Sequence, residues 1–276
     1  MKVVAYVAIS AAAMFSFLAS AQDAGEFSLP PEIQEKVVAH AKTERPLQPL
    51  GSYAIVLEID HKANFNKVYV DARRNLVRLE NGLIGIVGSS AFRNGKSQGS
   101  GRELSLCGFI ALLTESGSTS DTSTSTAIPI GKQFVQFGMK SAVDFSRRFR
   151  LVSFDASVPS VCNPVPGSEF TYKAETEYTI KTVGQFLGPR TSSGRRTDAG
   201  TCRVSNEVEP AAKINPALQG EALTVTCETE TGAGRKDSTK RVFVRDAGLY
   251  LTTDQMEGGM QHTSYQYSDV SYLKPD

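Results

Sequence analysis

The sequence predicts a mainly β protein, built from antiparallel, strongly twisted sheets, with one short helix near the N-terminus. From Ser52 onward, short apolar runs alternate with turn signals such as Asn81-Gly82. The clearest strand covers 170–182, where aromatic and small residues alternate with Lys, Glu and Thr. A β-sandwich or a half-barrel satisfies this pattern, and the pattern leaves room for one more helix near 102–114.

The first 21 residues have the features of an export signal. Lys2 precedes an apolar stretch, and Ala19-Ser20-Ala21 fits the small-residue rule for cleavage before Gln22. The sequence therefore predicts a signal peptide over 1–21 and an exported protein, periplasmic or extracellular. No later apolar run is long enough for a transmembrane helix, and no Cys follows the cleavage site for a lipid anchor.

The remaining chain divides into a polar start with a helix and two β-rich parts. Residues 22–48 hold the polar start and a helix that Pro30-Pro31 opens and that runs to about Thr43. The first β-rich half is expected over 49–160 and the second over 167–276, with a Pro-rich boundary between them. Loops are expected over 89–102, over 188–201 and over 114–126, where ten of thirteen residues are Ser or Thr.

Four cysteines lie in the predicted mature chain. An even number in an exported protein favours two disulfides, and four cysteines allow three pairings. We favour Cys107–Cys162 and Cys202–Cys227, because each bridge then stays within one half of the chain. A metal site is disfavoured, since the sequence has no C-x-x-C and no His close to a Cys.

Charge balance narrows the classes of function. Without Lys2 the chain would hold 29 basic and 29 acidic residues, so it is formally neutral. Neutrality argues against nucleic-acid binding and against a protein held on anionic lipid by net charge. The sequence favours a non-catalytic protein of the cell envelope that binds an apolar or amphipathic ligand on a curved sheet. The alternative is a structural or protein-interaction module of the envelope.

Candidate binding residues are arginines and tyrosines in the β-rich parts. They could contact an apolar or anionic small molecule, or an envelope protein, whereas each group also has an ordinary structural explanation. Arginines on a solvated loop or on the wet face of a strand, and tyrosines that close a sheet, need no ligand. The residues are Arg190, Arg195 and Arg196 in the expected loop 188–201, Arg148 and Arg150 in a Phe-rich strand, and Tyr265 and Tyr267 near the C-terminus.

Signals for catalysis are weak. Gly95-Lys96-Ser97-Gln98-Gly99 matches the G-x-S-x-G pattern of serine hydrolases, and His262 follows in the required chain order. The residues before the motif do not form the buried strand that such a nucleophile needs, so Ser97 and His262 remain weak candidates. No cofactor or metal is expected.

Overall fold

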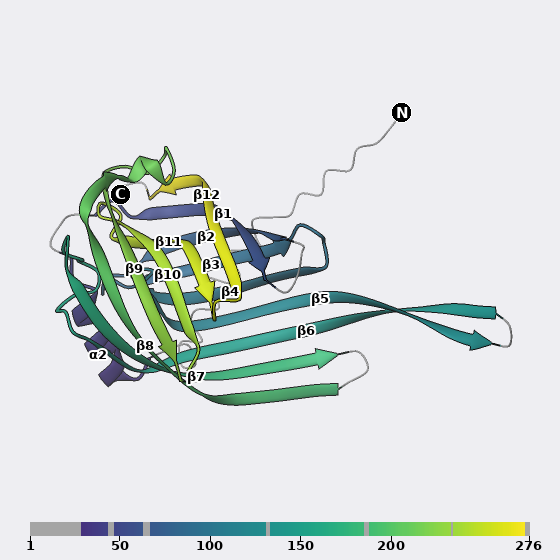
Figure 1. Cartoon of the computed structure of the whole chain (residues 1–276). Helices are drawn as coiled ribbons and strands as arrows, with labels where there is room; N and C mark the ends of the chain where they lie inside the picture. Colours follow the sequence, from purple (N-terminus) through teal and green to yellow (C-terminus); the bar gives the residue numbers. More distant parts are fainter. Residues whose placement is uncertain are drawn as a thin grey trace.

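Twelve antiparallel strands close into one barrel (Figure 1). The computed structural model describes residues 29–43, 47–62, 67–130, 133–184, 188–232 and 234–273, and only the backbone over 121–141. Each strand pairs with its neighbours in sequence, and β12 pairs with β1. The elements are α2 (Pro31–His40), β1 (Leu50–His61), β2 (Val68–Arg78), β3 (Ile84–Phe92), β4 (Ser97–Leu106), β5 (Ile110–Ile130), β6 (Gln133–Ala156), β7 (Glu169–Gly184), β8 (Gly188–Pro210), the 3-10 helix η2 (Ala211–Lys213), β9 (Glu221–Thr231), β10 (Lys236–Val244), β11 (Leu249–Glu257) and β12 (Gln261–Tyr272).

The mainly antiparallel β fold and the N-terminal helix are therefore confirmed. The predicted signal peptide 1–21 and the polar residues 22–28 lie outside the described residues. None of the helices in the described part of the chain is long and apolar enough to cross a membrane. Residues 157–168 connect β6 to β7, which pair with each other, and the division into two β-rich halves stays a prediction.

Four sequence-based assignments were wrong. The helix expected near 102–114 is instead the end of β4, a turn and the start of β5. The loops expected over 89–102, 114–126 and 188–201 belong mostly to strands β3, β4, β5 and β8.

These strands are rich in Gly, Ser and Thr, and pairing with neighbouring strands compensates for their weak intrinsic preference. Two glycines of β4 are also required by a close approach of β5. A Cβ atom at Gly101 would lie 2.6 Å from the carbonyl oxygen of Glu115, and one at Gly99 would lie 2.9 Å from that of Gly117.

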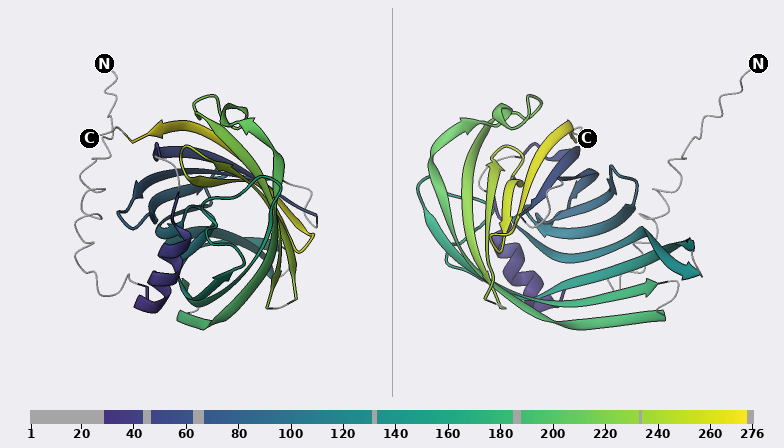
Figure 2. Two further views of the ribbon diagram at one scale, coloured as in Figure 1. Left: turned by 90° about the vertical axis from the view of Figure 1, so that its left-hand side faces the viewer. Right: turned by 45° about the vertical axis from the view of Figure 1, so that its right-hand side comes forward.

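One end of the barrel is filled, and we call it the closed end. Helix α2 lies there (Figure 2), and its buried Ile33 and Val37 join one apolar cluster with Leu106, Phe109 and other inward side chains. Both disulfides, Cys107–Cys162 and Cys202–Cys227, lie in this cluster. They are the two bridges that the cysteine spacing favours.

The connection 157–168 fastens α2 to the barrel. The hydroxyl of Ser160 donates hydrogen bonds to the carbonyl oxygens of His40, at 2.7 Å, and Lys42, at 2.9 Å. The hydroxyl of Tyr250 donates to the carbonyl oxygen of Val161 at 2.8 Å. These contacts hold the end of the helix against the barrel at the edge of the apolar cluster.

At the closed end, the β10–β11 hairpin lies inside the barrel wall formed by β2 and β3. β11 pairs with β12 only through 254–257 and 261–264, and the two strands separate beyond these residues. There the outward side chains of β10 and β11, such as Val242 and Leu251, share a second apolar cluster with inward side chains of β2 and β3, such as Leu76. The β10–β11 hairpin is therefore packed on both faces.

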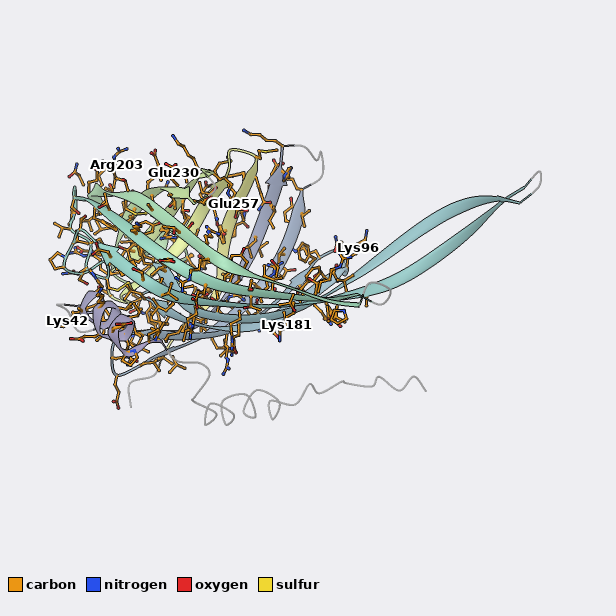
Figure 3. The ribbon with its side chains drawn as sticks, turned by 90° about the horizontal axis from the view of Figure 1, so that it is seen from below. Lys42, Lys96, Lys181, Arg203, Glu230 and Glu257 are labelled. Carbon is orange, nitrogen blue, oxygen red and sulfur yellow. A yellow bond between two sulfur atoms is a disulfide. The ribbon has the colours of Figure 1, made fainter. Side chains whose placement is uncertain are left out.

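The outer surface is mostly polar along the strands. In β9, Leu223, Val225 and Cys227 are buried, whereas Thr226 and Glu228 between and beside them are exposed. Charged side chains surround the barrel in Figure 3, where Lys181 points away from it. At the end opposite α2, the hairpins β5–β6 and β7–β8 extend beyond the other strands (Figure 1).

Candidate functional site

The inner face of the barrel is not filled at the end opposite α2, which we call the open end. Leu57, Ile59, Phe92, Phe149 and Tyr178 all face inward by strand alternation and register, yet all remain partly exposed. Inward side chains that keep contact with water require space inside the strands. We refer to this space as the lumen.

Arg241 on β10 forms the floor of the lumen, directly above the apolar cluster. It faces inward with Phe243, and its guanidinium carbon lies 4.9 Å from the ring centroid of Phe109. Its Nε is fully buried and has no hydrogen-bond partner, and burial lowers the pKa of its guanidinium. Among the described residues no carboxylate pairs with Arg241, and the residue as a whole is partly exposed.

Four tyrosines surround Arg241, and their hydroxyls are engaged elsewhere. Tyr172 bonds Thr229 at 2.8 Å, and Tyr250 donates to the backbone at the closed end. Tyr265 donates to Oε1 of Gln255 at 2.8 Å, and Tyr267 donates to the carbonyl oxygen of Thr252 at 2.7 Å. Burial raises the pKa of Tyr250, Tyr265 and Tyr267, so these phenols stay neutral beside the cation.

A second arginine on the inner face, Arg74, has hydrogen-bond partners within the protein. The guanidinium of Arg74 donates to the carbonyl oxygens of Arg73, at 3.0 Å, and Ser89, at 3.1 Å. The carboxyl group of Glu103 lies near it, and burial raises the pKa of that carboxyl despite the attraction of Arg74. Arg74 therefore has partners that Arg241 lacks.

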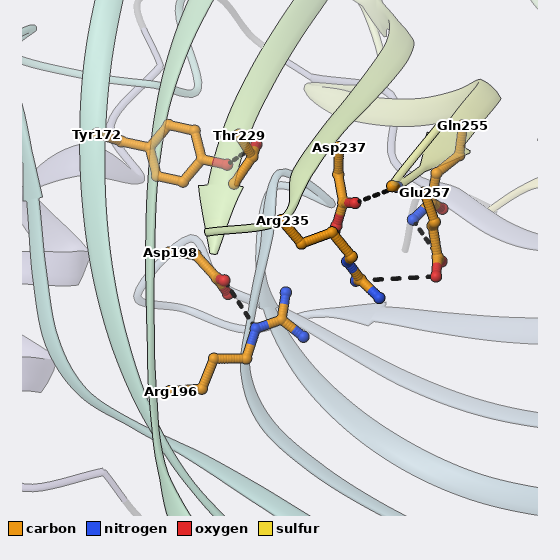
Figure 4. Close-up of polar contacts among 9 residues, drawn as sticks. Tyr172, Arg196, Asp198, Thr229, Arg235, Asp237, Gln255 and Glu257 are labelled. Atoms are coloured by element: carbon orange, nitrogen blue, oxygen red, sulfur yellow. Dashed lines mark hydrogen bonds and ion pairs between the residues drawn. The ribbon is translucent and has the colours of Figure 1, made fainter. Parts of the chain in front are cut away.

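Polar side chains also line the mouth of the lumen along β8, β10 and β11 (Figure 4). Arg235 pairs with Asp237 at 2.8 Å and lies 3.8 Å from Glu257. Asp237, which is 9% exposed, also accepts the backbone N–H of Gly258 at 2.8 Å. The mouth is thus polar along these strands, whereas β1 and β2, which follow β11 beyond β12, contribute Leu57, Ile59 and Val68, which are apolar.

The arginines predicted as anion-binding residues are mostly paired on the outer surface. Arg148 pairs with Glu115 at 2.5 Å, and Arg150 and Arg195 both pair with Glu177, at 2.8 and 2.7 Å. These cross-strand pairs stabilise neighbouring strands and lower the pKa of Glu177.

The other two arginines of this group lie on β8. Arg196 pairs with Asp198 at 2.7 Å near the mouth (Figure 4), and Arg190 is exposed near the tip of the β7–β8 hairpin. Both therefore lie on a strand rather than on the loop that the sequence suggested. Arg148, Arg150 and Arg195 are kept apart from the lumen, whereas Tyr265 and Tyr267 line its floor.

The structure does not bring Ser97 and His262 together. Ser97 begins β4 directly after a hairpin turn, and three strands separate β4 from β12. The ring of His262 pairs with Asp254 at 2.7 Å on the outer face. A hydrolase nucleophile sits on a strand-to-helix turn within reach of its base, and neither condition holds here.

A shallow groove of about 930 Å³ crosses the outer face of β1–β6, lined mainly by small and polar residues such as Ser89, Ala91 and Ser100. In the part of the chain that the structure describes, no three or more His, Cys, Asp and Glu side chains gather so as to hold a metal ion.

No family model matches this chain, and neither the search of characterised proteins nor that of solved structures finds a similar one. Arguments about function therefore rest on the residues themselves.

Sequence reasoning missed Arg241. In residues 237–244 every second side chain lies on the inner face, namely those of Asp237, Thr239, Arg241 and Phe243. The charged Arg241 therefore shares a face with the buried ring of Phe243. The shared face of Arg241 and Phe243 was the available signal in the sequence. It could not be distinguished from a solvent-exposed strand face until the closed barrel defined which face is inside.

Proposed function

We propose that this protein is an exported binding protein that holds an apolar or amphipathic molecule in the lumen of its barrel. The observation that carries the proposal is the set of inward apolar side chains that stay partly exposed at the open end, Leu57, Ile59 and Phe92 among them. Water in contact with such side chains is displaced favourably by an apolar ligand. The two disulfides support an oxidising compartment outside the cytosol.

The lumen has the composition expected of such a site. Its β1–β2 side is apolar, and its other side and floor carry a small number of fixed polar groups. Ligand pockets in proteins usually combine an apolar lining with a few polar groups that fix orientation. A barrel filled throughout would instead bury these inward side chains.

Binding of the neutral fluorescent probe N-phenyl-1-naphthylamine tests the proposal. Leu57→Gln places an amide in the lumen, and its matched control Val56→Gln places the same group on the outer face of the same strand. We expect Leu57→Gln to weaken probe binding roughly tenfold, as the loss of an apolar contact of about 1.4 kcal/mol predicts. Equal effects of both variants, or no probe binding by the wild-type protein, would contradict the proposal.

A protein-interaction role is the second candidate, because the long β5–β6 hairpin has unpaired backbone edges. β4 pairs with β5 only as far as Ser120, and β7 pairs with β6 only from Val143 onward. Among the described strands, none covers the edges of β5 over 121–130 or of β6 over 133–142. Such edges accept an added strand from a partner protein. Shortening the hairpin at 121–142 would abolish capture of an envelope partner and leave probe binding unchanged.

A further inference from the structure

Arg241 is costly for the protein in the absence of a ligand. Its guanidinium belongs to a partly buried residue, has a buried Nε without a hydrogen-bond partner and pairs with no carboxylate of the described residues, so part of its hydration is lost without replacement. Arg78 also has a buried Nε without a hydrogen-bond partner, but its Nη groups donate to the carbonyl oxygens of Gly82, Ala247 and Gly248. Arg74 likewise donates to two carbonyl oxygens. Arg241 is thus a partly exposed cation on the inner face that packs on the ring of Phe109.

We propose that Arg241 binds the anionic headgroup of a single-chain amphiphile, of the fatty-acid class, whose chain lies along the inner faces of β1 and β2. This inference rests on the proposed function and names its ligand class. Guanidinium groups recognise carboxylates through paired N–H donors. The phenols around Arg241 are neutral, and among the described residues no carboxylate pairs with its guanidinium.

The register of the strands places an apolar path from Arg241 to the open end. Arg241 pairs with Thr252, whose carbonyl accepts the hydroxyl of Tyr267, and Tyr267 pairs with Ile55. From this level Ile55, Leu57 and Ile59 succeed one another on the inner face toward the open end. At about 3.3 Å per residue this row is roughly 13 Å long. Val70 and Val68 of β2 pair with Leu57 and Ile59 and widen it.

A headgroup at the floor and a chain toward the open end satisfy both halves of the site. The reverse orientation would leave Arg241 without an anion and place the apolar chain against it. A small anion alone would pair with Arg241 but would leave the apolar row in contact with water. The combination of the two features therefore specifies an amphipathic anion.

The test compares ligands that share a chain and differ in charge. Dodecanoate, dodecanol and acetate compete with N-phenyl-1-naphthylamine for the wild-type protein, Arg241→Met, Arg241→Lys and the outer-surface control Arg203→Met. Arg203 pairs with Glu169 and is exposed, so its variant removes an equal charge outside the lumen. We expect the wild type and Arg203→Met to prefer dodecanoate over dodecanol by roughly tenfold or more.

Arg241→Met should lower that preference to about one while it leaves dodecanol binding unchanged, and Arg241→Lys should retain part of it. An unchanged preference in Arg241→Met would overturn the role of Arg241. If acetate competes as well as dodecanoate, the ligand of Arg241 is a small anion, and the proposed amphiphile is overturned. Binding of dodecanol without any preference in the wild type would overturn this inference alone. Failure of every chain-bearing ligand to bind would overturn the proposed function with it.

Discussion

Replacing Arg241 with Met is expected to make the protein more stable. The side chain has a buried Nε without a partner, which costs about 1–3 kcal/mol. The contact with Phe109 returns part of this, about 1–2 kcal/mol for a desolvated cation over a ring. Met has no charge to desolvate, and apolar replacements of buried charges are often stabilising by about 1–4 kcal/mol. We expect a net gain of about 1 kcal/mol in the free energy of unfolding.

Arg78→Met is the matched comparison, because it removes another guanidinium whose buried Nε has no partner, but whose Nη groups, unlike those of Arg241, donate to backbone carbonyls. Three hydrogen bonds of 3.0 to 3.2 Å would be lost, and the carbonyl oxygens of Gly82, Ala247 and Gly248 would lose their donors. With charged hydrogen bonds at about 1.5–3 kcal/mol each, partly offset by desolvation, we expect a loss of about 3 kcal/mol. The two substitutions are chemically identical and should change stability in opposite directions.

Urea unfolding followed by far-UV circular dichroism measures both changes, with the disulfides intact and no ligand added. The chain has no Trp, so an intrinsic tryptophan signal is not an option. A loss of about 2 kcal/mol or more in Arg241→Met, similar to that in Arg78→Met, would show that Arg241 stabilises the fold. The interpretation of Arg241 as a residue kept for ligand binding at the expense of stability would then be refuted.

Three further predictions concern the fold. Removing the Cys202–Cys227 bridge, which spans 25 residues, should lower the free energy of unfolding by about 3.5 kcal/mol in urea titration, and an unchanged midpoint would contradict this. Glu103→Gln should raise the free energy of unfolding more at pH 7 than at pH 4, because the raised pKa of Glu103 makes its ionisation cost more in the folded state than in the unfolded chain. Thermal unfolding at the two pH values measures this, and equal gains would count against it. Val37→Ala should lower the free energy of unfolding in urea titration by about 2–3 kcal/mol, whereas the exposed Lys36→Ala should lower it by less than about 0.5 kcal/mol. Similar losses in the two variants would mean that α2 does not pack against the barrel.

Local patterns in the sequence predicted the elements whose side chains alternate clearly. The strand over 170–182, the turn at Asn81-Gly82 and the helix from Pro31 all follow from periodicity and turn residues. The two disulfides followed from chain separation alone. In each case the information lies within a few tens of residues, which is the range over which such patterns operate.

The remaining features depend on contacts between distant segments. The segments that form β4, β5 and β8 are polar and Gly-rich, so their composition predicted loops. Their extended form depends on pairing with neighbouring strands. The pairing of β1 with β12 joins residues about 200 positions apart and leaves no local pattern. Without that closure the inner face of β10 is undefined, which is why the outward Arg148, Arg150 and Arg195 were selected and Arg241 was not.

Native mass spectrometry of the protein, recovered without refolding from the cells that make it, shows whether Arg241 holds a ligand in the lumen. We expect a species heavier than the disulfide-bonded chain, whose extra mass leaves on activation and is an anionic amphiphile with a single chain. The same preparation of Arg241→Met should have lost it. A bare wild-type chain, or an adduct that is equally retained by Arg241→Met, would contradict the claim that Arg241 holds a ligand in the lumen.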